Sequence, residues 1–161
     1  MGIMAYYTEM TRIRTAAIGD LPHLLHHRRA MYESMGHTDE AMLDEVLRVS
    51  ELYFRIALPN GRYRGYLAET EEGRVVGGGG IVINDWPAHP RETMPLRVWI
   101  LNMYVEPEFR RLGIAKRLME AMVGWCRAEG FRNVSLHASN EGRPLYEAMG
   151  FVPTNEMRLE L

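Results

Sequence analysis

Residues 103–116 read Met103-Tyr104-Val105-Glu106-Pro107-Glu108-Phe109-Arg110-Arg111-Leu112-Gly113-Ile114-Ala115-Lys116, and this stretch decides the fold class. The nearly continuous apolar run that ends at Val105 predicts a central strand covered on both faces. A turn with two arginines and a glycine follows, and the apolar spacing after it predicts an amphipathic helix. A helix N-terminus leaves backbone N–H groups unpaired, which favours a bound phosphate. Spacing alone supports ordinary helix capping equally well, so the context of the turn has to decide.

Downstream of this turn the chain alternates between helices and strands. The predicted helix closes at Gly130, and residues 132–138 predict a strand. A short helix over 141–149 and one or two strands within 151–161 complete a β-α-β-α-β order. This order predicts a mixed sheet with helices packed on it.

The N-terminal half predicts a strand over 10–15, two helices and two further strands. Asp20 and Pro22 open the first helix and Gly36 stops it. Its helical spacing is carried by Leu21, Leu24, Leu25, Arg28, Met31, Tyr32 and Met35. The second helix starts at Thr38 or Asp39 and ends near residues 58–61, before strands over 63–69 and 74–84. Four consecutive glycines, Gly77 to Gly80, predict a thin and bulged part of the second of these strands, and the proline-rich residues 86–95 predict a loop.

A second motif, Ser139-Asn140-Glu141-Gly142-Arg143-Pro144-Leu145-Tyr146-Glu147-Ala148-Met149-Gly150-Phe151, follows the turn after one helix and one strand. Together the two motifs resemble the Gcn5-related N-acetyltransferase (GNAT) superfamily. The resemblance implies an α/β fold of mixed α+β type, with a mostly antiparallel sheet flanked by helices and splayed at an acetyl-CoA groove. With no repeat or linker in the sequence, we expect one N-acetyltransferase domain over residues 1–161.

The resemblance also implies roles for individual residues. The backbone of Met103 and Val105 would pair with the pantetheine arm, and the amides of residues 111–116 would hold the pyrophosphate. Tyr146 would protonate the departing thiolate as the catalytic acid. The family often has Asn seven residues before this tyrosine; that position is Ser139 here, with Asn140 beside it, and either side chain can cap the short helix. The cofactor-binding set is Met103, Tyr104, Val105, Arg110, Arg111, Leu112, Gly113, Ile114, Ala115, Lys116, Ser139 and Asn140.

The implied reaction is direct transfer of an acetyl group from acetyl-CoA to a primary amine of unidentified acceptor, without a metal. The central strand offers no carboxylate as general base, which leaves a water chain or His137, with Glu33, Asp85 and Glu92 as weaker candidates. The alternative is a non-catalytic acyl-CoA-binding or sensing domain with the same fold. A nucleotide-binding α/β protein is more remote, because its glycine-rich turn would follow an early strand.

The charge and hydropathy of the chain limit the classes of partner that we expect. The formal net charge of −2 gives no global basic field, so we expect no nucleic acid partner. No apolar stretch approaches 18 residues and no signal peptide is evident, so we expect no membrane partner and a cytoplasmic location.

The one cysteine, Cys126, lies on an apolar helix stripe, and we expect it to be chemically inert and to serve only in packing. His23, His26 and His27 are expected to be solvated rather than metal ligands, because no third ligand is apparent. A homodimer is possible, since apolar or aromatic residues are frequent near the termini, namely Met4, Tyr6, Tyr7 and Met157.

Overall fold

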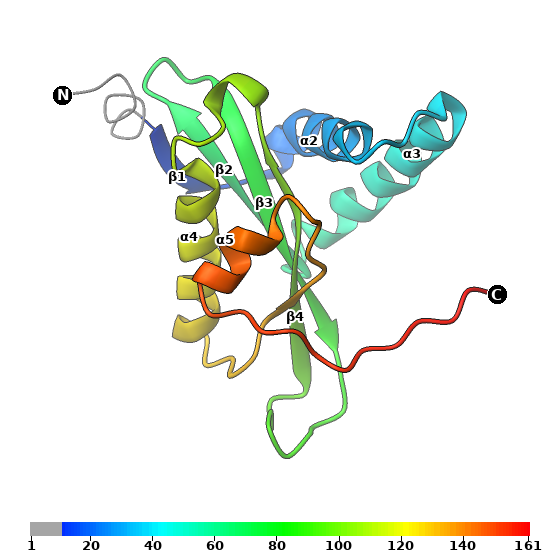
Figure 1. Cartoon of the computed structure of the whole chain (residues 1–161), viewed down its shortest axis with the longest axis vertical. Coiled ribbons are helices and arrows are strands. Elements are labelled where there is room, and N and C mark those ends of the chain that lie inside the picture. The colour runs from blue at the N-terminus through cyan, green and yellow to red at the C-terminus, as the bar shows by residue number, and fades with distance from the viewer. Residues whose placement is uncertain (1–10) are drawn as a thin grey trace.

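A five-stranded sheet forms the centre of the computed structural model, which describes residues 11–161 (Figure 1). Its strands lie in the order β1-β2-β3-β4-β5, and all neighbours are antiparallel except the parallel pair β4 and β5. Their bounds are Thr11–Thr15, Tyr63–Thr70, Val75–Asp85, Leu96–Val105 and Ser135–Leu136. The predicted mixed, mostly antiparallel sheet is therefore confirmed.

Helices cover both faces of this sheet. They are α2 (Leu21–Ser34), α3 (Glu40–Ala57), α4 (Ile114–Ala128) and α5 (Arg143–Ala148), with short 3-10 turns η1 (Ile18–Asp20) and η2 (Pro107–Phe109). Because successive side chains of a strand point to opposite faces, neighbouring residues of β2 serve different layers. Tyr63 and Leu67 pack with α2 and α3, whereas Tyr66 and Ala68 pack in the cluster that contains α4. The molecule thus has two apolar layers that meet only through the sheet.

Most of the predicted element boundaries agree with the structure to within about two residues, the usual uncertainty of helix ends. Asp39, predicted as a possible start of the second helix, is its N-cap, and its side chain accepts from the backbone N–H of Met42. Met10, at the predicted start of the first strand, lies outside the described residues. Cys126 is buried in the α4 layer, as predicted, and burial raises the pKa of its thiol to about 11.

Two predicted strands near the C-terminus are wrong in extent. The strand predicted over 132–138 pairs only at Ser135 and Leu136, and residues 151–161 contain no strand. The C-terminal segment extends away from the body (Figure 1). Its side chains at Val152, Met157, Leu159 and Leu161 are 77% or more exposed. Alternation of apolar and polar residues describes a strand only where a neighbouring strand supplies hydrogen bonds, and none lies beside this segment within residues 11–161.

Strand β4 carries a bulge at Asn102. Gly78 pairs with Tyr104 and Gly80 with Leu101, so β4 has one more residue than β3 across this interval. Asn102 has φ 59, a left-handed conformation that Asn adopts more readily than most residues. Opposite it, a Cβ on Gly80 would lie 2.0 Å from the hydroxyl oxygen of Tyr63, so only glycine fits. The predicted thin strand is confirmed, but the extra residue opposite these glycines lies on the facing strand β4 and not on β3. Both strands lie inside the sheet.

Candidate active site

The sheet splits just beyond the middle of β4. Strand β5 pairs with β4 only at Trp99 with Ser135 and Ile100 with Leu136. The N–H of Glu106 donates to the carbonyl of Val76 on β3, so the backbone groups of Val105 point to the opposite edge, into the split. The carbonyl of Val105 accepts there from Nε of Arg110 at 3.0 Å. An open strand edge of this kind pairs readily with an extended ligand.

The turn after β4 presents its backbone to solvent. Arg111 and Gly113 have φ 62 and φ 78, so two left-handed residues lie close together directly before α4. Helix α4 has no side-chain cap, and the first N–H groups of a helix have no intrahelical acceptor. Successive N–H groups in such a turn form a concave anion site that adds to the positive end of the helix dipole. A Cβ on Gly113 would meet no protein atom within 4 Å, so the turn faces open space.

Arg110 and Arg111 behave differently within this turn. Arg110 binds the Val105 carbonyl, lies 5.8 Å from the centre of the Tyr104 ring and is 3.8 Å from the carboxylate of Glu141. It therefore ties the turn to the segment before α5, across the split. Arg111 is exposed.

Ser139 and Asn140 separate clearly in their surroundings. The Ser139 hydroxyl accepts from the N–H of Gly142 at 3.1 Å, and its carbonyl accepts from the N–H of Arg143 at 3.0 Å. Ser139 therefore stabilises the turn that precedes α5, whose N-cap is Gly142. Asn140 is exposed, and its side chain makes no hydrogen bond to any described residue.

Tyr146 lies on α5 with its ring in the α4 layer, against Phe151 at a centroid distance of 6.1 Å. Within residues 11–161 its hydroxyl has no protein hydrogen-bond partner, although the residue is only 8% exposed. Burial raises the pKa of this phenol above its ordinary value. The group therefore holds its proton at neutral pH and can donate it.

Comparison with known proteins identifies this arrangement. The sequence model of the acetyltransferase (GNAT) family matches residues 23–151. The chain belongs to the acetyltransferase (GNAT) family. The predicted family, fold and class of enzyme are thus confirmed, and the cosubstrate of this N-acetyltransferase is acetyl-CoA.

Individual relatives agree with this assignment. A GCN5-related N-acetyltransferase from Ralstonia eutropha JMP134 is 33% identical, with a TM-score of 0.87 over 94% of this chain and 98% of that one. An aminoglycoside N(6')-acetyltransferase type 1 from Salmonella enteritidis is 26% identical over 83% of this chain and 88% of its own length. Human N-acetyltransferase 8 is 32% identical over 56% of this chain, and that match spans only 39% of the human protein.

The carboxylates considered as general bases are engaged elsewhere in this acetyltransferase. Glu33 pairs with Arg29, and Asp85 pairs with Arg62. Glu92 is buried, and the backbone N–H groups of Arg132 and Met94 bond to it; these bonds lower the pKa of its carboxyl. None of the three is brought to the split in the sheet.

His137 lies directly after β5, next to the split. Its ring packs on Trp99 of β4 at a centroid distance of 4.9 Å, and its Nε2 is 3.0 Å from the carboxylate of Glu156. The side chain is largely exposed. A histidine oriented by a carboxylate and open to solvent is chemically able to accept a proton.

The histidines of α2 correct one prediction. His27 is not solvated: it is 2% exposed, and neither ring nitrogen has a hydrogen-bond partner. Burial lowers the pKa of its imidazole to about 4, so the ring is neutral. It packs against Tyr104 and over Gly78, where a Cβ would lie 2.9 Å from Nδ1. His26 binds the carboxylate of Glu106 at 2.7 Å, and no group of three or more potential metal ligands occurs among residues 11–161.

A polar group at the bulge was missed by sequence reasoning. Asn102 donates to the hydroxyl of Tyr63 at 3.2 Å and accepts from Nη1 of Arg28 at 2.5 Å. The available signal was Arg28 itself, a cation within the apolar stripe of the first helix. Its partner could not be identified from the sequence, because Asn102 comes from β4 and is in turn bound to Tyr63 of β2.

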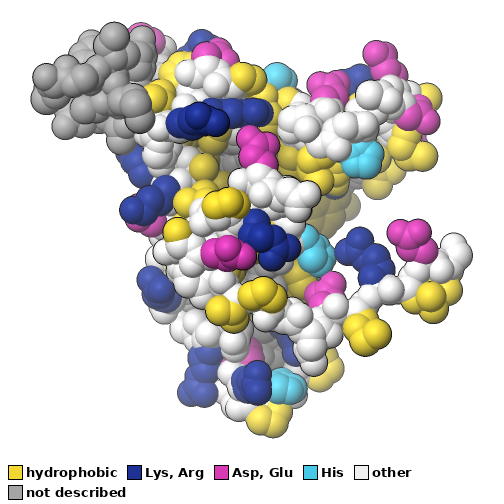
Figure 2. All heavy atoms as spheres, viewed as in Figure 1, with side chains coloured by type: hydrophobic (Ala, Val, Ile, Leu, Met, Phe, Trp, Pro, Cys, Tyr) yellow, Lys and Arg dark blue, Asp and Glu magenta, His cyan; other side chains and the backbone are white. Residues whose placement is uncertain are grey.

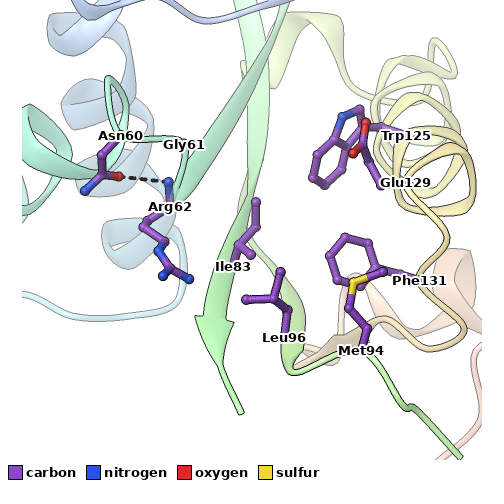
Figure 3. A pocket seen from close by; sticks show the side chains of 9 residues that line it. All are labelled: Asn60, Gly61, Arg62, Ile83, Met94, Leu96, Trp125, Glu129 and Phe131. Atoms are coloured by element: carbon purple, nitrogen blue, oxygen red, sulfur yellow. Dashed lines mark hydrogen bonds between the residues drawn. The ribbon is translucent and has the colours of Figure 1, made fainter. Parts of the chain in front are cut away.

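Two hollows in the surface lie away from these residues. One measures about 520 Å³ and is lined by Ile83 and Leu96 of the sheet, by Met94, and by Trp125, Glu129 and Phe131 at the end of α4, with Asn60, Gly61 and Arg62 opposite (Figure 3). A second one, of about 320 Å³, adjoins Tyr53 and Asp85. Neither contains Tyr146 or any residue of the turn, so the split in the sheet is the better candidate for the chemistry.

No helix in the described part of the chain is long and apolar enough to cross a membrane.

Proposed function

We propose that the split between β4 and β5 binds acetyl-CoA and that the acetyl group passes there directly to a primary amine. The observation that carries this proposal is the open edge of β4, which leads within eleven residues from Met103 to the uncapped start of α4 at Ile114. An extended pantetheine arm fits the strand edge, and a pyrophosphate fits the helix N-terminus.

The roles follow from these surroundings. Met103 and Val105 bind the arm, with the Val105 carbonyl shared with Arg110. The amides of residues 111–116 bind the pyrophosphate. Tyr104 supports Arg110 beside this turn, and Asn140 reaches the cofactor while Ser139 holds the turn before α5.

The chemistry is an acyl transfer in two steps. The amine nitrogen attacks the thioester carbon to form a tetrahedral intermediate, and the carbon–sulfur bond then breaks as the C=O bond re-forms. Tyr146 gives its proton to the departing thiolate. The proton that the amine loses passes either to a water chain or to His137, which Glu156 holds by a hydrogen bond.

Thiol release from acetyl-CoA, measured with a panel of primary amines, tests the proposal. We expect release that depends on the amine, with an N-acetylated product of matching amount. Tight acetyl-CoA binding without transfer to any amine would contradict the enzyme and support the sensing domain instead. His137→Gln separates the two proton routes: kcat should fall if His137 is the base and stay unchanged if a water chain takes the proton.

We also propose that residues 1–161 form one domain, located in the cytoplasm, that assembles as a homodimer. The support for a dimer is the C-terminal segment, whose apolar side chains at Val152, Met157, Leu159 and Leu161 are exposed. The other residues predicted for this interface, Met4, Tyr6 and Tyr7, lie outside the described part. Light scattering should report twice the chain mass of 18.6 kDa, and that mass alone at high concentration would exclude a dimer.

A further inference from the structure

Arg28 lies at the bulge of β4, on the α2 side of the sheet. Its Nη1 donates to Asn102, the residue before Met103. Its guanidinium lies 5.1 Å from the centre of the Tyr32 ring. Asn102 is in turn fixed by its bond to Tyr63, which is buried to 2% exposure and whose pKa burial raises to about 12. The cation is therefore held in one place by groups from α2, β2 and β4.

No ion pair with residues 11–161 neutralises the charge of Arg28. Its neighbour Arg29 binds the carboxylates of both Glu33 and Asp44, whereas no carboxylate of residues 11–161 lies within ion-pair distance of Arg28. The Nε of Arg28 is buried and has no hydrogen-bond partner. A partly buried guanidinium with unused donors is costly unless an anion completes it.

The position of this cation relative to the split is specific. Met103 follows Asn102 and, in the proposed function on which this inference rests, binds the arm that carries the thioester. Tyr146 belongs to the α4 layer, so Arg28 lies on the other face of the sheet. The amine has to reach the thioester from a side that Tyr146 does not occupy. The space-filling view shows the surface hollowed on the right, between the region of α2 and α3 and the C-terminal segment (Figure 2).

We propose that Arg28 binds a carboxylate of the acceptor and that the substrate class is amines carrying a carboxylate close to the amino group, as in α-amino acids. The planar fork of arginine matches a carboxylate through two parallel hydrogen bonds. The guanidinium lies over the ring of Tyr32. Burial raises the pKa of the Tyr53 phenol and the charge of Arg28 opposes that rise, so Tyr53 lies within the field of this cation. A polycationic acceptor would meet repulsion here, in contrast to the aminoglycosides named for the Salmonella relative.

The test compares matched acceptors. Wild-type protein is assayed with the L-amino acids and with the corresponding amides, which keep the amine and lose the carboxylate, and with kanamycin as a polycation. We expect kcat/KM to be roughly tenfold or more higher for the acids, the usual effect of a hydrogen bond to a charged group. Arg28→Met should raise KM for the acids by a similar factor and leave transfer to the amides within about twofold. KM for acetyl-CoA should not change.

Two further variants separate binding from folding. Arg28→Lys keeps the charge and loses the fork, so it should retain part of the preference for acids. Arg29→Met removes the adjacent arginine, which is paired away from the bulge, and should change neither preference nor KM. A wild-type preference for amides or kanamycin would overturn the inference, and so would an Arg28→Met variant that loses acids and amides equally. Absence of transfer to every amine, with acetyl-CoA still bound, would instead refute the proposed function.

Discussion

The two sides of β4 present different chemical groups, backbone on one side and side chains on the other. On the side of α4 and α5, the proposed cofactor site consists of backbone groups: an open strand edge, two left-handed turn residues and an uncapped helix start. On the side of α2 and α3, the proposed acceptor site consists of side chains: Arg28, Asn102 and Tyr63 in one hydrogen-bonded row. Backbone donors suit a pyrophosphate that is common to every reaction of the family, whereas side chains can change with the acceptor.

The largest expected effect is on the backbone side, at Gly113. Gly113→Glu places a negative charge where the pyrophosphate is proposed to bind, at a φ of 78 that costs an L-residue about 1–2 kcal/mol. The turn can relieve that strain only by leaving its left-handed conformation, which would misdirect the N–H groups. Calorimetry should show acetyl-CoA affinity falling by roughly a hundredfold or more, that is, by at least about 2.7 kcal/mol.

Gly124 offers a matched control for this substitution. It lies on the same helix, is exposed, and a Cβ there meets no atom within 4 Å. Gly124→Glu adds the same side chain and should leave acetyl-CoA affinity unchanged. Equal affinities in the two variants would place the pyrophosphate elsewhere. Gly113→Ala, which brings the strain without the charge, should fall between them.

The next effect is on the chemical step, at Tyr146. Tyr146→Phe keeps the ring in the α4 layer and removes the proton, so kcat should fall at least tenfold, since general acids typically contribute ~10²–10⁴-fold. Acetyl-CoA affinity should change little. Because burial raises the pKa of Tyr146, the donor form is lost only as pH rises above that raised value. The wild-type alkaline limb from this group should therefore lie above about pH 10.

Tyr66 is the control for Tyr146. It is also a buried tyrosine in the α4 layer, but its hydroxyl accepts from Nε of Arg64 at 2.9 Å. Tyr66→Phe should leave kcat unchanged in an assay where chemistry limits the rate. A Tyr146→Phe variant with wild-type kcat under the same conditions would show that water protonates the thiolate.

The difference between the two sides also explains what the sequence could predict. The proposed cofactor site uses residues 103–116 and 139–151, so consecutive residues and their spacing were sufficient to predict it. The proposed acceptor site joins residue 28 to residues 63 and 102, and only the folded sheet brings these together. The predicted C-terminal strands were wrong because alternation of apolar and polar residues cannot supply a pairing partner. The prediction that His27 is solvated was wrong because its burial depends on Gly78, which lies on another element and has no side chain.

Packing of the acceptor side can be disturbed through Gly80. Gly80→Ala places a Cβ 2.0 Å from the hydroxyl oxygen and 2.2 Å from Cζ of Tyr63, so the ring has to move away from Asn102. Overpacking of this kind typically costs ~1–3 kcal/mol in the free energy of unfolding. Urea denaturation should show that loss, and KM for the acceptor should rise while acetyl-CoA affinity stays constant.

Gly124 is again the matched control, and the same substitution there should have the opposite effect on stability. Gly124→Ala removes a glycine from an exposed position within α4 and should stabilise the protein by ~0.5–1 kcal/mol. If Gly80→Ala were as stable as wild type, the glycine row would not be what positions Tyr63. If it weakened acetyl-CoA binding as strongly as acceptor binding, the two sides of β4 would not be separable.

The smallest expected effects distinguish Ser139 from Asn140, which lie on the proposed cofactor side just before α5. Ser139→Ala removes the hydroxyl that accepts from the N–H of Gly142 in the turn before α5, and loss of one such hydrogen bond typically costs ~0.5–1.5 kcal/mol. Asn140→Ala removes an exposed side chain without a protein partner, so the free energy of unfolding should not change. If Asn140 contacts the cofactor, its loss should raise KM for acetyl-CoA about fivefold, the effect of one ordinary hydrogen bond of about 1 kcal/mol. Ser139→Ala should act on kcat instead, because α5 carries Tyr146.

The reverse pattern would be a KM for acetyl-CoA that responds to Ser139 and a stability that responds to Asn140. It would assign the cofactor contact to Ser139 and show that the bond of Ser139 to Gly142 breaks when acetyl-CoA binds.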